Sequence, residues 1–170
     1  GIRAAQALVR HSLRPVIIDE AARAGGQIYR QPPAHFQRTK KALYGFEATR
    51  ADAVHGAMAD ILDQVDYRPD TLVWNAEGGQ LDLLHQGRTG SIAYTQVIVA
   101  TGATDRVLPF PGWTTPGVYT LGGAQVALKF QACAIGSQVV FLGTGPLLYL
   151  IAYQYARAGA GSADPPVQLS

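Results

Sequence analysis

The chain has 170 residues, of which 48% are hydrophobic and 15% are charged, and its formal net charge is +2. This composition is typical of a well-packed globular protein and argues against a disordered one. The small, dispersed positive charge does not predict binding to nucleic acid. No apolar run reaches the roughly twenty residues of a membrane span, so we expect one full domain, or one domain with part of another.

The single cysteine, Cys133, excludes a disulfide framework, a Cys-x-x-Cys redox pair and a thiolate metal cluster within this chain. We therefore expect a reducing, cytoplasmic setting and no metal site. The four histidines lack metal-ligand spacing, and we expect each to have a packing or surface role.

The first residues predict the second half of a strand-helix-strand unit. Apolar residues recur at helical spacing over residues 2–9, and Pro15 ends that helix. The apolar run at residues 16–18 then predicts a strand. Because the chain starts at Gly1, directly in the helical pattern, we expect the preceding strand to be missing and the chain to be truncated there.

The middle of the chain changes its period. Residues 31–49 predict an irregular connection, and residues 51–65 predict a helix. Short strands at 72–74, 81–84 and 91–94, separated by glycines, then predict an antiparallel meander.

The last third returns to a parallel pattern. The β-branched run at 97–100 predicts a buried parallel strand, and residues 111–117 predict a linker-like crossing. A helix at 123–134, a strand at 139–142 and a helix at 146–158 follow.

Two of these strands end in glycine turns, Thr101-Gly102 and Gly143-Thr144-Gly145-Pro146. Glycine lets the backbone approach a phosphate because no Cβ intervenes, and a following helix directs unpaired N–H groups at the negative charge. The two turns therefore predict dinucleotide cofactors.

The second turn is the weaker signal. It offers Gly143, Gly145 and Pro146 as candidates for NAD(P), but Leu148 stands where a third glycine would allow close helix packing. No strand is recognisable after it, because residues 159–170 are small, polar and broken by proline. We expect residues 114–158 to begin an NAD(P)-binding domain and residues 159–170 to be an irregular tail. The choice between NAD and NADP stays open.

Three further motifs stand out: Gly25-Gly26-Gln27-Ile28-Tyr29-Arg30, Ala100-Thr101-Gly102-Ala103-Thr104-Asp105-Arg106 and Pro109-Phe110-Pro111-Gly112-Trp113. Together they resemble the FAD subunit of opine oxidase-like and hydrogen cyanide synthase-like amino-acid dehydrogenases, which are flavoproteins with two dinucleotide-binding domains. The resemblance implies an α/β, three-layer FAD/NAD(P)-binding Rossmann-like fold with a small antiparallel β-meander, truncated at both ends. Residues 1–113 would then be a partial FAD-binding domain without its first strand.

The resemblance also implies residues of the FAD site. Gly1 looks like the last glycine of a Gly-x-Gly-x-x-Gly turn, which places Asp19 where a carboxylate binds the ribose hydroxyls. Glu20 would share that role or face solvent. The alternative is that both carboxylates are merely solvated residues at the end of a strand.

The same family brings two backbone turns close to the cofactor. Gly25, Gly26 and Gln27 would approach the flavin or the pyrophosphate, although paired glycines also occur in plain turns. Thr101 and Gly102 match the turn at which the chain passes beside FAD.

The implied function is an FAD-dependent oxidoreductase subunit that oxidises an amino-acid-like or opine C–N bond, or relays its electrons, beside a second flavoprotein subunit. The disulfide-reductase branch of this architecture is not favoured, because residues 27–34 hold no cysteine pair. The alternative is a nucleotide-binding or assembly module without catalysis of its own. No catalytic residue is assigned, and the substrate and electron acceptor stay open.

Overall fold

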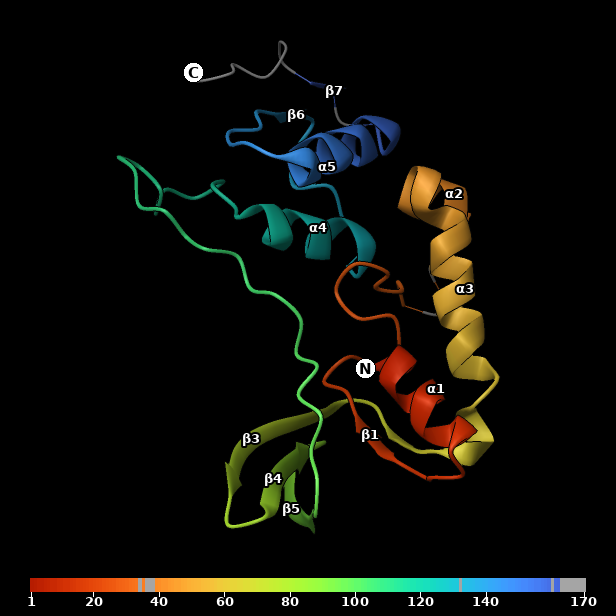
Figure 1. Ribbon diagram of the computed structural model, residues 1–170. Helices are drawn as coiled ribbons and strands as arrows, with labels where there is room; N and C mark the ends of the chain where they lie inside the picture. Colours follow the sequence, from red (N-terminus) through yellow and green to blue (C-terminus); the bar gives the residue numbers. More distant parts are fainter. Residues whose placement is uncertain (34, 36–38, 132, 160, 163–170) are drawn as a thin grey trace. The chain divides into compact units, whose positions relative to one another are not determined.

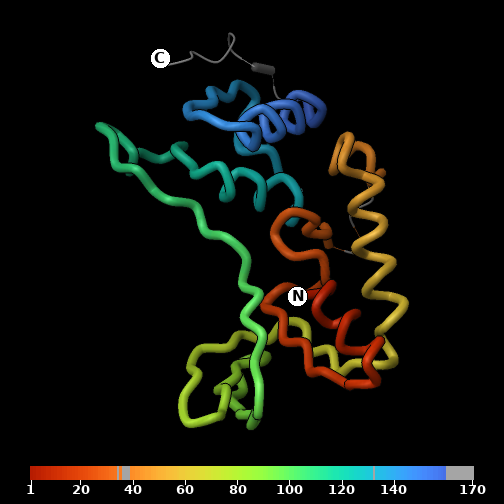
Figure 2. Tube along the Cα trace, in the orientation of Figure 1, coloured from red at the N-terminus to blue at the C-terminus, as the bar shows by residue number. Residues whose placement is uncertain are grey.

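The computed structural model describes residues 1–33, 35, 39–131, 133–159 and 161–162 (Figure 1). The chain forms two compact units. Unit 1 comprises residues 1–29 and 50–102, and unit 2 comprises residues 30–49 and those from 103 onward. The chain therefore passes between the units three times, as the trace in Figure 2 allows the reader to follow. No helix within the described ranges has the length and apolar character needed to cross a membrane.

Unit 1 begins with the predicted helix and strand, α1 (Ile2–Arg10) and β1 (Val16–Ile18). Strand β1 pairs in parallel with β2 (Asp66–Arg68), which the sequence pattern did not reveal because it is short and polar. Helix α3 (Ala48–Ala59) and the 3-10 turn η2 (Leu62–Gln64) connect them. The core of this part is formed by Ala5, Ala24, Met58, Ile61 and Val65.

The meander is confirmed. It consists of β3 (Thr71–Glu77), β4 (Gln80–His85) and β5 (Arg88–Ala93), which form an antiparallel sheet in that order. Glycines with positive φ make its two tight turns, at Gly78-Gly79 and at Gly87.

Unit 2 contains α4 (Leu121–Lys129), β6 (Gln138–Val139), α5 (Pro146–Arg157) and β7 (Gly161–Ser162). Helices α4 and α5 pack through a core of Ala124, Leu128, Ile151 and Tyr155. The Tyr155 hydroxyl donates a 2.8 Å hydrogen bond to Ala124 O. The predicted helix at 146–158 is confirmed, and the one expected at 123–134 begins and ends earlier.

The expectation of a buried strand at residues 97–100 is wrong. This segment is not in a strand, and Val97, Ile98 and Val99 are 48%, 58% and 76% exposed. The physical reason is the lack of a partner strand. Among the described strands β1 pairs only with β2, so no strand lies beside residues 97–100 to cover their side chains. High β propensity without a partner strand does not bury a side chain.

The expectation of an irregular connection at 31–49 is also wrong in part. Helix α2 (Lys40–Tyr44) and the 3-10 turn η1 (Gly45–Glu47) lie within it. The Thr39 hydroxyl caps α2 by accepting a hydrogen bond from Ala42 N, and Tyr44 is almost fully buried. A cap and two buried side chains were enough to form a helix of one turn.

The end of the chain differs as well. The strand expected at 139–142 is limited to β6, and Val140 is 78% exposed. Within the tail that we expected to be irregular, β7 pairs in parallel with β6. Two residues can pair through their backbones without a β-branched pattern, which is why no sequence signal indicated β7. The rest of the expected tail, residue 160 and residues 163–170, lies outside the described residues.

Candidate functional site

The turn at Gly25-Gly26 is closed in a way that only glycine permits. Gly25 has a φ of +148°, and a Cβ there would collide with the carbonyl oxygen of Tyr29. The Tyr29 N–H donates to Gly25 O at 3.3 Å. His55 of α3 donates from Nε2 to Tyr29 O at 2.9 Å, a bond that fixes the far end of the turn. His55 therefore has a structural role in holding the turn that carries Gln27.

Gln27 joins this turn to the predicted turn at Thr101-Gly102, which also lies in unit 1. Its Nε2 donates a 3.4 Å hydrogen bond to Thr101 O, across 74 positions of sequence. Gly102 follows with a φ of +79°, and a Cβ there would lie 3.5 Å from Gln27 Nε2. The structure thus brings together Gln27, Thr101 and Gly102.

Gly1 lies next to the same segment. It is the N-cap of α1, and a Cβ on it would lie 4.0 Å from the Cβ of Ala100. As a glycine, this N-cap has no side chain to cap the helix, and the first turn of α1 holds no acidic residue. The first N–H groups of α1 therefore carry the partial positive charge of the helix terminus without a counter-charge in that turn, which suits an anion.

Asp19 lies half-buried at the carboxyl end of β1. Its Oδ1 accepts a 3.0 Å hydrogen bond from Ala21 N. Its backbone is held on both sides, because its N–H donates to Arg68 O and its carbonyl accepts from Thr71 N, each at 3.0 Å. Glu20, in contrast, is exposed. The structure orders the first carboxylate and leaves the second at the surface.

Tyr67 is a residue that sequence reasoning missed. Its hydroxyl is buried and has no hydrogen-bond partner among the described residues. Burial raises the pKa of Tyr67 to about 12, and the negative charges of Asp19 and Asp70 add to the effect. A lone tyrosine in a short polar strand carries no signal in the sequence, because only the pairing of β2 with β1 brings it near Asp19.

The second glycine turn lies in unit 2. Gly143 and Gly145 have φ values of +147° and +98°, and Gly145 is the N-cap of α5 with Pro146 in its first turn. Leu148 is 6% exposed, and its Cδ1 would lie 3.8 Å from a Cβ on Gly143. The leucine that replaces the expected third glycine therefore packs against the first glycine of the turn.

These features define a class of protein. A helix that starts at a glycine and a carboxylate at the end of a parallel strand are features of a dinucleotide-binding, Rossmann-like fold. No group of side chains that could hold a metal ion occurs in the part of the chain that the structure describes.

The chain belongs to the pyridine nucleotide-disulphide oxidoreductase family, whose model matches residues 1–162. It is 37% identical to hydrogen cyanide synthase subunit HcnB of Pseudomonas protegens, over 94% of this chain and 34% of that protein. It is 36% identical to an opine oxidase subunit of Agrobacterium tumefaciens, over 94% of this chain and 33% of that protein. The chain thus spans about a third of the length of these relatives, and the resemblance inferred from the motifs is confirmed.

A solved structure supports the fold. The crystal structure of L-proline dehydrogenase from P. horikoshii matches with a TM-score of 0.75 and 20% identity, over 97% of this chain and 33% of that one. The Rossmann-like class and the antiparallel meander predicted from the sequence are therefore confirmed.

Proposed function

We propose that this chain forms part of the FAD site of an oxidoreductase subunit that acts on the C–N bond of an amino-acid-like or opine substrate. The observation that carries the proposal is the hydrogen bond from Gln27 to Thr101, which holds two glycine turns beside the open N-terminus of α1. The names of the two relatives, which are subunits of an opine oxidase and of a hydrogen cyanide synthase, support the substrate class.

In this proposal each element has a stated role. Asp19 accepts hydrogen bonds from the ribose hydroxyls, and the first N–H groups of α1 bind the pyrophosphate. The backbone at Gly25, Gly26 and Gln27 and at Thr101-Gly102 approaches the cofactor closely because these turns are rich in glycine. The exposure of Glu20 favours its solvent-facing alternative. FAD, when bound, supplies the acceptor of two electrons.

The proposal extends to domains and partners. We assign residues 1–113 to an FAD-binding domain and residues 114–158 to the start of an NAD(P)-binding domain, and we place the protein in the cytoplasm. We also propose a second flavoprotein subunit as its partner, which is supported by the names of both relatives, since each is a subunit. The packing of Leu148 against Gly143 departs from the nicotinamide fingerprint, so NAD(P) is the weaker of the two cofactor assignments.

A purification with added FAD tests the proposal. We expect the chain to retain FAD after gel filtration and to show the visible absorbance of a flavoprotein. Anaerobic addition of an opine, in the presence of the partner subunit, should bleach that absorbance. A protein that retains FAD without bleaching would favour the nucleotide-binding module. A protein that retains no FAD would contradict the site itself.

A further inference from the structure

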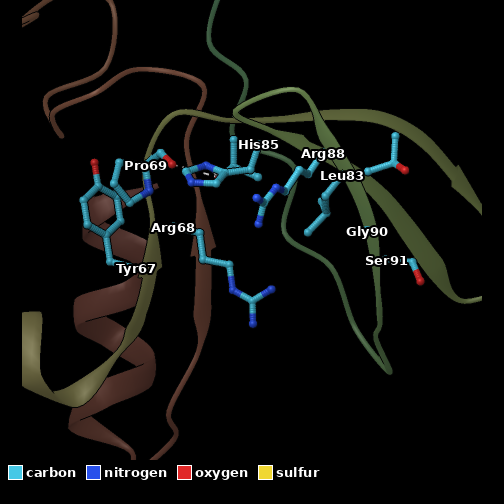
Figure 3. A pocket seen from close by; sticks show the side chains of 10 residues that line it. Tyr67, Arg68, Pro69, Leu83, His85, Arg88, Gly90 and Ser91 are labelled. Atoms are coloured by element: carbon cyan, nitrogen blue, oxygen red, sulfur yellow. Dashed lines mark hydrogen bonds between the residues drawn. The ribbon is translucent and has the colours of Figure 1, made fainter.

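A hollow that the FAD site does not use lies within unit 1, between β2 and the three-stranded sheet (Figure 3). Its volume is about 510 Å³. It is open to solvent and contains none of the residues assigned above to FAD. The residues that matter here are Arg68, Thr71, Leu83, His85, Arg88 and Gly90.

The register of the meander explains why its residues that line the hollow share one face of the sheet. His85 pairs with both Thr71 and Arg88, and Leu83 pairs with Gly90. Directly opposed residues on antiparallel strands point to the same side of the sheet, and residues two positions apart do so too. Leu83, which is buried, forms the apolar floor, and the polar side chains surround it.

The hollow has an excess of positive charge. Arg68 forms a 2.8 Å ion pair with Asp66. No described residue forms an ion pair with Arg88. Figure 3 shows the side chains of Arg68, His85 and Arg88 around the hollow, with that of Arg68 running away from the other two. The described residues that line the hollow thus include two arginines and no carboxylate, with Leu83 as the apolar floor. The negative charges of Asp19 and Asp70 act on Tyr67, which also lines the hollow.

His85 is held in a defined orientation. Its Nδ1 lies 3.1 Å from Asp70 O and 3.2 Å from Thr71 Oγ1. Because a carbonyl oxygen can only accept a hydrogen bond, Nδ1 is the protonated nitrogen and donates to Asp70 O.

We propose that this hollow binds a phosphate group. Guanidinium groups bind phosphate oxygens in a bidentate manner, with more geometric specificity than a point charge. Gly90 leaves room for the ligand, since a Cβ at that position would meet no atom within 4 Å. The site is open and is framed by β4 and β5.

The phosphate could come from two sources. Thr71 donates its N–H to Asp19 O, so the hollow borders the strand end that carries the proposed ribose carboxylate. A phosphate of a bound nucleotide is therefore one source, and a free phosphate or phosphate ester is the other. The charge and shape argument is the same for both, and it holds whether or not FAD binds.

Titration of the folded chain with inorganic phosphate tests the proposal, by calorimetry at low ionic strength. We expect Arg88→Gln to weaken phosphate binding by about tenfold, because charge-assisted hydrogen bonds are lost. Gly90→Leu should weaken it by a similar factor while every charge is retained, because the leucine fills the hollow. Arg157→Gln, which removes an exposed arginine from unit 2, is the charge-matched control and should have no effect.

The same titration with saturating FAD separates the sources. Unchanged phosphate binding is expected for a site of free phosphate or a phosphate ester, because the pyrophosphate of FAD is assigned to α1. Competitive loss would instead place a phosphate of FAD in the hollow and would contradict that assignment. Absence of phosphate binding by the wild-type chain overturns the proposal. Equal binding by Arg88→Gln, Gly90→Leu and the wild type also overturns it, provided that circular dichroism shows the variants to be folded.

Discussion

Asp105 Oδ2 accepts a 2.7 Å hydrogen bond from Gly122 N, so a carboxylate from the loop before α4 caps the first turn of that helix. Thr120 Oγ1 caps the next N–H, that of Gly123, at 3.1 Å. Two of the N–H groups left unpaired at the start of α4 are thus satisfied, and the negative charge is favourable there. The motif that contains Asp105 therefore has a structural role beside the one that its resemblance implies.

Asp105→Ala should lower the free energy of unfolding of unit 2 by about 1 kcal/mol, as the loss of an N-cap does. Gly122→Ala should also be destabilising, since its Cβ would lie 3.0 Å from the carboxyl carbon of Asp105. Gly56→Ala in α3 is the control, because a Cβ there meets nothing within 4 Å. That variant should gain roughly 0.5 to 1 kcal/mol. Urea denaturation measures all three, and an unchanged Asp105→Ala midpoint would contradict the capping role.

Lys129 makes the stability of unit 2 depend on pH. It is 2% exposed, its Nζ lies 5.6 Å from the centre of the Tyr44 ring, and burial lowers its pKa to about 8, partly offset by Glu47. Between pH 8 and 10.5 the unfolded chain binds more protons than the folded one. The free energy of unfolding should therefore rise with pH in this window, by at most about 1.4 kcal/mol per unit.

Denaturation between about pH 7 and pH 10, followed by Trp113 fluorescence in a Trp74→Phe background, measures this rise. Lys129→Met should abolish it and should be more stable than the parent at about pH 7, because a buried charge is removed. A rise that persists in Lys129→Met would assign the pH dependence to another group.

Tyr67→Phe should leave the stability of unit 1 unchanged or raise it by up to about 1 kcal/mol, because the buried hydroxyl that it removes has no partner among the described residues. Tyr155→Phe is the matched contrast in unit 2, since it removes a hydroxyl that is bonded to Ala124 O, and it should cost about 1 kcal/mol. Thermal unfolding at neutral pH compares the two variants.

Tyr67 should also make the stability of unit 1 depend on pH. Because the pKa of Tyr67 is raised from 10.0 to about 12, the parent should lose stability as the pH rises through this interval, and Tyr67→Phe should lose less.

Asp19→Asn tests the ribose assignment and keeps the hydrogen bond from Ala21 N, because the amide oxygen can still accept it. If Asp19 binds the ribose, the affinity for FAD should fall by about tenfold, the usual effect of losing a hydrogen bond to a charged group. Glu20→Gln, at the exposed neighbour, should bind FAD as the parent does. Quenching of flavin fluorescence measures both affinities. Equal losses in the two variants would indicate a general electrostatic effect.

Elements whose signals are local could be predicted from the amino-acid order alone. Helical spacing over residues 2–9, the proline that follows and the glycines between the meander strands each act through nearby backbone, so α1, β1 and the β3–β5 sheet were predictable. The family could be inferred in the same way, because its motifs are short and contiguous.

Which residues meet depends instead on the folded chain. The contact of Gln27 with Thr101, the pairing of β2 with β1 and the charges of Arg68 and Arg88 around one hollow all join positions that are separated in the sequence. Residues 97–99 are exposed for a related reason, since burial depends on a neighbouring strand and not on the β-branched side chains themselves. Local propensity acts within a few residues, whereas pairing and packing depend on partners that no local pattern specifies.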